Sequence, residues 1–233
     1  MYAPVESPMT TVEEAIASRR SVRAFLPTPV PRSEVERILA LASRSASNSN
    51  VQPWQVHVVT DEAKRRLTAA LLDAFDTVGR TPPEYPYQPA PHEWVEPFRS
   101  RRSRFGEGLY GGALGLRSED TVRREAHHRR NYDFFGAPVG MILTVSRHPR
   151  QSALLDAGLF LQALMLAARG FGLHTCPQAS FIDFSAVLRE QLSIPEDQLI
   201  VCGIALGHAD PDHCLHAYRT PREPTSSFAT FHS

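Results

Sequence analysis

The stretch Ser152-Ala-Leu-Leu-Asp-Ala-Gly-Leu-Phe-Leu-Gln-Ala-Leu-Met-Leu-Ala-Ala-Arg169 predicts one long helix, which Gly170 and Gly172 end. Apolar side chains cover nearly its whole circumference: Leu154, Leu155, Leu159, Phe160, Leu161, Leu164, Met165 and Leu166. A helix that is apolar on every side has to be buried on every side. We therefore expect either a central helix or one that also faces a second subunit.

Shorter elements flank this helix in a mixed order. Capping patterns and apolar periodicity predict further helices over 11–16, 33–45, 61–75 and 185–192. Alternating or continuous apolar runs predict strands over 55–60, 138–145 and 198–206. Residues 175–180 are expected to form a loop, and the chain from Gly207 onward an extended tail. Helices and strands without strict βαβ alternation favour an α+β fold.

No internal repeat or clean linker divides the chain, so its 233 residues predict one domain, 1–233. Residues about 79–130 stand out as an irregular insertion. Its first part is rich in proline and aromatic residues and resembles a functional lid or arm, and residues 99–130 are expected to be helical in part. Acidic residues interleave with the arginine runs of this segment, which favours a solvated helix face over a nucleic-acid surface.

The charge balance excludes several classes of protein. Lysine plus arginine and aspartate plus glutamate both number 25, so the formal net charge is zero, which argues against non-specific nucleic-acid binding. Lys64 is the single lysine in the sequence, and no Gly-Lys dipeptide exists for a P-loop. A Schiff-base enzyme would have to use Lys64, which sits in an ordinary helix pattern. Any phosphate held here is therefore expected to be bound by arginine.

The three cysteines, Cys176, Cys202 and Cys214, show no C-x-x-C spacing, so neither a disulfide framework nor a cysteine zinc site is expected. Cys176 has no evident His partner for nucleophilic chemistry, and His174 is expected to be structural. Residues 1–10 lack a signal-peptide pattern, and the apolar run 157–168 is short for a membrane span. We expect a cytoplasmic protein without a membrane or metal partner.

Two polar clusters could carry binding chemistry. In Arg19-Arg-Ser-Val-Arg-Ala-Phe25, three arginines flank a serine where the first helix ends. They could bind a phosphate, or simply be favourable cations at a helix C-terminus. In Ser47-Asn-Ser-Asn-Val-Gln-Pro-Trp54, amides and hydroxyls crowd a loop. They could pair with the edge of a heterocycle, or simply shape a turn.

Two further stretches follow the long helix. In His174-Thr-Cys-Pro-Gln-Ala-Ser180, the proline stiffens the backbone and Ala179 is small enough for a flat ligand to approach it. Gly203-Ile-Ala-Leu-Gly207 suggests close packing of a strand, and Arg219 lies downstream of it.

Together, these stretches resemble the FMN-dependent nitroreductase family, in the family's order and over nearly the whole chain. Phe135-Gly-Ala-Pro138 before a strand adds to the match, and the proline- and arginine-rich middle looks like the nitrobenzoate and nitroaromatic reductase branch. The resemblance implies a mixed or antiparallel central sheet flanked by helices. It also implies an intertwined homodimer with FMN at the subunit interface.

The resemblance assigns roles residue by residue. Arg19 and Ser21 match positions that bind the FMN phosphate and ribityl chain, Arg20 belongs to the same motif, and Arg219 matches a C-terminal phosphate-binding arginine. Arg23 matches a cation near flavin N1, where reduction builds negative charge. The loop that reaches the cofactor from the second subunit is matched by Ser47, Asn48, Asn50 and Gln52. A Pro-Glu-Gly segment whose backbone faces flavin N5 and O4 is matched by Pro177, Gln178 and Ala179.

Two of these positions depart from the family pattern, with Gln178 for glutamate and Ala179 for glycine. Backbone donation should survive both changes, whereas a role of the glutamate charge should not.

The implied reaction is a ping-pong hydride transfer from NADH or NADPH to a small aromatic acceptor, a nitroaromatic or a quinone, with no protein acid or base required. The alternatives are another flavin reaction on this fold (dehydrogenation, reductive dehalogenation or flavin fragmentation), a non-enzymatic flavin-binding module, or an arginine-rich nucleic-acid-binding module.

Overall fold

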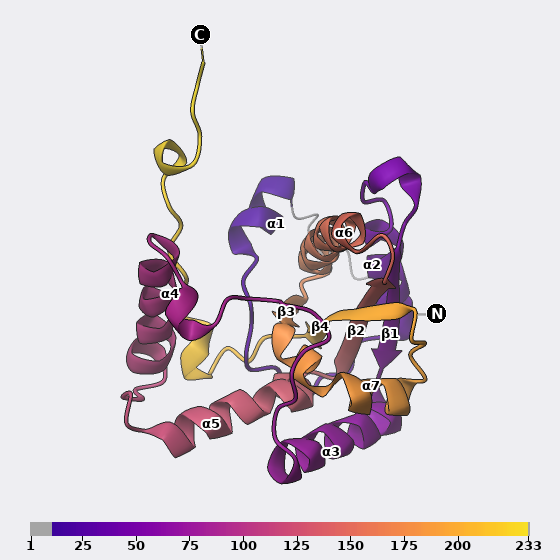
Figure 1. The fold of residues 1–233 in the computed structure, drawn as a ribbon, viewed down its shortest axis with the longest axis horizontal. Helices are drawn as coiled ribbons and strands as arrows, with labels where there is room; N and C mark the ends of the chain where they lie inside the picture. Colours follow the sequence, from indigo (N-terminus) through magenta and orange to yellow (C-terminus); the bar gives the residue numbers. More distant parts are fainter. Residues whose placement is uncertain (1–10, 233) are drawn as a thin grey trace.

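The computed structural model describes residues 11–232 and shows an α+β architecture (Figure 1). Its sheet has the strand order β1-β2-β4-β3, and every neighbouring pair is antiparallel. The strands are β1 (Trp54–Val59), β2 (Val139–Ser146), β3 (His174–Gln178) and β4 (Gln198–Gly207). The expected central sheet, mixed or antiparallel and flanked by helices, is therefore confirmed and is antiparallel.

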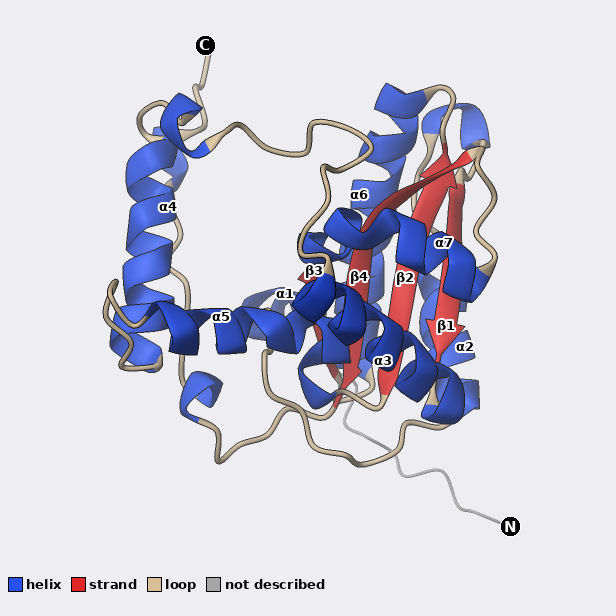
Figure 2. Ribbon diagram, turned by 60° about the horizontal axis from the view of Figure 1, so that its bottom comes forward, coloured by secondary structure: helices blue, strands red, loops and turns tan. Residues whose placement is uncertain are grey.

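Helices cover both faces of the sheet (Figure 2). The α-helices within residues 11–232 are α1 (Val12–Ser18), α2 (Arg32–Ala42), α3 (Asp61–Thr77), α4 (Phe98–Gly106), α5 (Thr121–Arg129), α6 (Arg150–Gly170) and α7 (Ser185–Leu192). One core joins α2 and α6 to one face, and the other joins α3 and α7 to the opposite face. Strand β2 is buried on both faces because Met141 and Leu143 point into the first core and Ile142 into the second.

Helix α6 is buried on one side only within a single chain. Phe160 and Leu164 lie in the core at 2% and 0% exposure, whereas Leu155 and Leu159 are 68% and 44% exposed. The 21-residue helix is longer than the apolar run, and by length and composition it could cross a membrane. Its inner face nevertheless packs on α2 and the sheet, as a core helix does.

Residues 174–178 form strand β3, so the loop expected over 175–180 is wrong. Pro177 counts against a strand in the sequence pattern, because proline has no backbone N–H to donate to a ladder. It is tolerated here because β3 is an edge strand of the four-stranded sheet, with β4 as its neighbouring strand. The strand leads directly into the 3-10 segment η5 (Ala179–Phe184).

Two glycines let aromatic rings approach the sheet closely. A Cβ atom on Gly203 would lie within 3.0 Å of the Phe181 ring, and one on Gly140 within 3.0 Å of the Phe134 ring. The two rings pack on each other with centroids 4.8 Å apart. Phe181 belongs to η5, so this packing fixes the segment that follows β3.

The insertion is helical in part, as expected. It contains α4, the π-helical turn η3 (Glu107–Ala113) and α5, after a proline-rich stretch with little regular structure. Helix α4 lies away from the sheet, next to the C-terminal segment (Figure 1). Tyr218 of that segment donates a hydrogen bond to the carbonyl of Phe105 at 3.2 Å, and Glu223 pairs with Arg104 at 3.3 Å.

Candidate functional site

The segment from Arg19 to Phe25 runs along the edge strand β3. Ser21 forms an isolated parallel bridge with Thr175, and the Val22 amide donates to the Thr175 carbonyl at 3.0 Å. The two expected cofactor segments, 19–23 and 177–179, therefore lie on neighbouring backbone strands. The fold brings them together through a connection that local sequence patterns do not show.

A cluster of arginines forms where this segment meets α6 and the C-terminal segment. Burial, and next the charge of Arg222, lowers the pKa of the Arg19 guanidinium. Burial, followed by the charges of Arg219 and Arg169, lowers the pKa of Arg20. Among the residues that the structure describes, none of these five arginines forms an ion pair with a carboxylate. Arg19, Arg20 and Arg169 are partly buried, and Arg219 and Arg222 are exposed. Cations that repel one another without a counter-charge suit an anion such as phosphate.

Histidine side chains lie next to two of these guanidinium groups. Arg20 Nη2 lies 3.1 Å from His216 Nδ1, and Arg169 Nη1 lies 3.1 Å from His174 Nε2. Burial, with the charges of Arg169 and Arg20 next, lowers the pKa of His174 to about 3. His174 is therefore neutral and accepts a hydrogen bond, which positions Arg169 without cancelling its charge.

Sequence reasoning missed three members of this cluster: Arg169, Arg222 and His216. Arg169 is the charged residue at the end of an otherwise apolar helix, which is a signal that could have been used. The placement of His216 and Arg222 depends on how the C-terminal segment folds back toward Arg19 and Arg20, and no local sequence pattern indicates that.

Arg23 lies next to the same strand but points toward the insertion. Its Nη1 donates to the Ser21 carbonyl at 3.4 Å, and its guanidinium lies 5.6 Å from the ring centroid of Phe105. Nearby Cys176 is 1% exposed, and burial raises the pKa of its thiol to about 11. Such a thiol stays protonated at neutral pH, which argues against a nucleophilic role.

Gln178 turns its side chain into the protein. It is 3% exposed, and its Nε2 donates to the Asn131 carbonyl at 2.7 Å. A glutamate carboxylate could not donate this bond, so glutamine suits the position better in this chain. The neighbouring Pro177 and Ala179 continue the backbone from β3 into η5.

The polar loop at 47–52 lies elsewhere. It contains the short 3-10 segment η1 (Asn48–Asn50), and its Asn48 amide donates to the two carboxylate oxygens of Asp156 at 3.1 and 3.2 Å. The Gln52 amide donates to Ser47 Oγ at 3.1 Å, which closes the loop. Asp156 is nine residues before Met165, the α6 residue that Arg19 contacts through its sulfur. At 1.5 Å per residue, the loop is about 14 Å along α6 from the arginine cluster.

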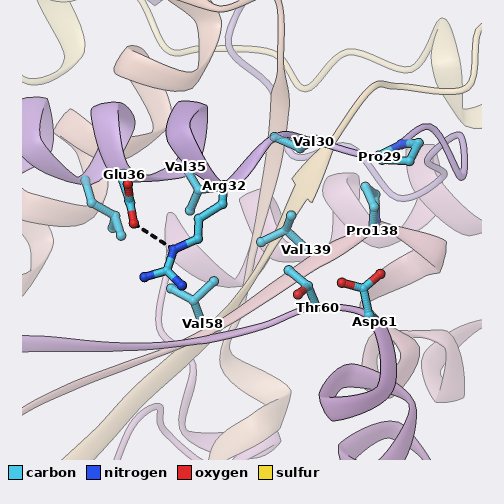
Figure 3. A pocket seen from close by; sticks show the side chains of 11 residues that line it. Pro29, Val30, Arg32, Val35, Glu36, Val58, Thr60, Asp61, Pro138 and Val139 are labelled. Carbon is cyan, nitrogen blue, oxygen red and sulfur yellow. Dashed lines mark hydrogen bonds and ion pairs between the residues drawn. The ribbon is translucent and has the colours of Figure 1, made fainter.

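Two cavities bear on the position of a site. The first, about 470 Å³, lies between α2 and the edge strand β1, and Figure 3 shows the Arg32–Glu36 ion pair on its wall at 2.7 Å. It contains none of the expected cofactor residues. The second, about 430 Å³, is bordered by Ala179 and Ser180 and by the proline-rich stretch that begins the insertion. This second cavity therefore adjoins the expected cofactor segment.

Comparisons with known proteins identify the family of this chain. The model of the family described as "Nitroreductase family" matches residues 16–208. A 4-nitrobenzoate reductase from Nocardioides sp. (strain LMS-CY) is 53% identical over 93% of this chain and 87% of its own length. A 4-nitrobenzoate reductase from Pseudomonas putida is 41% identical over 94% of each chain.

Solved structures give the same result. The FMN and NADPH-dependent nitroreductase NfnB from Sphigopyxis sp. strain HMH superimposes with a TM-score of 0.89 at 36% identity, over 96% of this chain and 99% of that one. The FMN-dependent NfnB from Mycobacterium smegmatis, solved with NADPH, gives a TM-score of 0.89 at 32% identity, over 95% and 97% of the two chains. In sequence and in fold, the chain belongs to the nitroreductase family.

Proposed function

We propose that this protein is an FMN-dependent oxidoreductase that uses NADH or NADPH to reduce small nitroaromatic or quinone acceptors, with carboxylated nitroarenes as its best substrates. The observation that carries the proposal is the cluster of arginines without carboxylate partners next to β3. The family supports it, as do the relatives that are 4-nitrobenzoate reductases and the NfnB structures that are FMN-dependent. The cavity next to Ala179 supplies room for an acceptor.

The residues present fit FMN. Its phosphate would be held by Arg19, Arg20 and Arg219, and Arg169 and Arg222 add charge to the same place. FMN, when bound, supplies the ability to accept a hydride and pass on two electrons. The remaining expected contacts are the Ser21 hydroxyl, the fixed cation of Arg23, and the backbone of Pro177, Gln178 and Ala179.

A second copy of the chain would complete the site. One chain keeps the loop of Ser47, Asn48, Asn50 and Gln52 away from the arginine cluster, at the opposite part of α6. The outer side of α6 is apolar and exposed at Leu155, as is Ile16 on α1 at 55%. A two-fold partner seated on this face would bury these side chains and could bring its own loop to the cluster. We therefore propose a homodimer, located in the cytoplasm.

The chemistry assigned to the chain itself is binding and orientation. The buried Cys176 thiol is protonated and His174 is neutral, so neither is proposed as a catalytic base. Arg23 offers a fixed positive charge next to β3, which would stabilise negative charge that develops in that place. Solvent can protonate the reduced acceptor, and we nominate no catalytic acid.

Anaerobic turnover tests the proposal. Purified protein should show the absorbance of an oxidised flavin, which NADH or NADPH bleaches and 4-nitrobenzoate restores. Steady-state rates with both nicotinamides against nitroarenes and quinones then define the preferred pair. Full FMN occupancy without reduction of any nitroarene would refute the proposed activity in favour of another flavin reaction on this fold. A colourless protein that FMN cannot reconstitute would refute the cofactor assignment as well and leave a non-flavin binding module.

A further inference from the structure

A second cleft extends the cavity that adjoins Ala179. The two spaces, about 430 and 400 Å³, have Arg80 and His128 in common as lining residues. The inner cleft begins at Ala179 and Ser180, and the outer cleft is bordered by Tyr110 and Arg124. A flat molecule that reaches the inner end would therefore point its far end at Arg80 and toward Arg124.

The two arginines of this cleft have no counter-ion among the residues described here. The neighbouring Arg129 shows the contrast, because it holds both oxygens of Asp76 at 2.9 and 2.6 Å. Arg124 lies over the Tyr110 ring, 4.1 Å from its centroid, and Arg80 appears in none of the ion pairs.

The other polar groups of the cleft are compatible with a bound anion. His128 Nε2 is buried without a hydrogen-bond partner, and so is Ser180 Oγ, within the part of the chain that the structure describes. Burial, and then the charge of Arg80, lowers the pKa of His128 to about 4, so this ring is neutral at pH 7. Two acids also border the clefts, Asp183 in the inner one and Glu125 in the outer one, and neither pairs with an arginine there. Burial raises the pKa of Asp183, and the nearby charge of Arg80 lowers it in part, so Asp183 lies within reach of Arg80 without forming an ion pair with it.

We propose that Arg80, assisted by Arg124, binds the carboxylate of a para-substituted nitroarene and so selects anionic acceptors over neutral ones. This inference rests on the proposed function, since the nitro group would occupy the inner end of the cleft next to Ala179. A guanidinium matches a carboxylate with two parallel N–H donors, and the proline-rich stretch forms one wall beside the ring between the two ends.

The test compares two acceptors of similar shape and different charge, 4-nitrobenzoate and 4-nitrobenzamide, on the FMN-loaded enzyme. Loss of a charged hydrogen bond predicts that Arg80→Gln lowers kcat/KM for 4-nitrobenzoate about 10- to 100-fold, mostly through KM. The value for 4-nitrobenzamide should change less than about 2-fold. Arg124→Gln should shift the same ratio by a smaller factor, and Arg80→Lys should recover part of the loss.

A matched control and a binding measurement complete the design. Arg123 lies next to Arg124 on α5, at an exposed position that borders neither cleft. Arg123→Gln therefore removes one positive charge outside the clefts and should leave the ratio of the two acceptors unchanged. Benzoate, which cannot be reduced, should bind the wild type more tightly than Arg80→Gln by the same factor in calorimetry.

An unchanged ratio in both Arg80→Gln and Arg124→Gln would overturn the subsite, and so would an equal effect of Arg123→Gln. If Arg80→Gln does not retain FMN, Arg124→Gln decides, through its ratio for the two acceptors and its affinity for benzoate compared with the wild type. Failure of the wild type to reduce either acceptor refutes the proposed function instead. Equal use of both acceptors by the wild type refutes the carboxylate subsite and leaves the reductase activity in place.

Discussion

Gly203→Ala tests the packing that positions the end of β3. Gly203 lies on β4, paired with Ile142 on one side and Gln178 on the other, so the backbone has no free edge along which to move. A methyl group there would lie within 3.0 Å of three ring carbons of Phe181, whose side chain is 0% exposed. Overpacking of a core costs about 1–3 kcal/mol. Because neither the ring nor the strand can yield cheaply, we expect a loss near the upper end, about 3 kcal/mol.

Urea unfolding followed by circular dichroism measures this change, with an unchanged m-value expected. Gly106→Ala on α4 is the control, because no atom lies within 4 Å of the added Cβ, and it should be neutral or stabilise by up to about 1 kcal/mol. Phe181→Ala alone should cost about 3–5 kcal/mol, and the double variant should cost clearly less than the sum, because the methyl group enters the vacated space. The reasoning would be refuted if Gly203→Ala were as stable as the wild type. It would also be refuted if the losses of unfolding free energy in the two single variants summed to the loss in the double variant.

Three further predictions follow from the contacts of other charged groups. Arg19→Ala should weaken FMN binding by about 1.5–3 kcal/mol, measured as the dissociation constant of the reconstituted protein, and an unchanged constant would remove Arg19 from the phosphate site. Glu84 ties the insertion to the body through Arg147 at 3.1 Å and Arg189 at 2.8 Å, so Glu84→Gln should lower the free energy of unfolding by about 1–3 kcal/mol. A loss below about 0.5 kcal/mol in urea unfolding would show that the carbonyl partners of Arg189 suffice. His174 has a folded pKa of about 3, well below its ordinary value of 6.5, so the unfolded chain takes up this proton first as pH falls, and stability is lost from about pH 6.5 downward. His174→Gln should make the free energy of unfolding fall less steeply between pH 7 and pH 5, and an equal slope would contradict the assignment.

The periodic parts of the fold could be predicted from sequence. Helix α6 and strands β2 and β4 are long and apolar, so one local pattern determines each of them. Strand β3 could not be found in this way because Pro177 counts against a strand everywhere except at a sheet edge, and the sequence does not show which strand lies at the edge. The exposed half of α6 likewise follows from the packing of one chain, which composition cannot reveal.

The candidate site was predictable only where short motifs carry it. Arg19, Ser21 and Gln178 stand in recognisable stretches, and the structure places their segments side by side. Arg169 and His216 join the cluster through contacts between distant segments. Arg80 becomes a candidate for binding the acceptor only because it shares a cleft with Arg124. Long-range placement of this kind depends on the whole fold rather than on local spacing.

The ion pairs of individual arginines point to anion-binding sites that the net charge of the chain does not reveal. The chain has equal numbers of acidic and basic residues, and many of its arginines are neutralised by neighbours, as Arg129 is by Asp76. Among the described residues, two groups of arginines without a carboxylate partner lie around Arg19 and around Arg80. Grouping like charges without counter-ions costs free energy unless a ligand of opposite charge binds there. One place suits a permanently bound phosphate and the other a carboxylate that comes and goes with each turnover. Raised ionic strength should therefore weaken acceptor binding at the open cleft more than cofactor binding at the half-buried cluster.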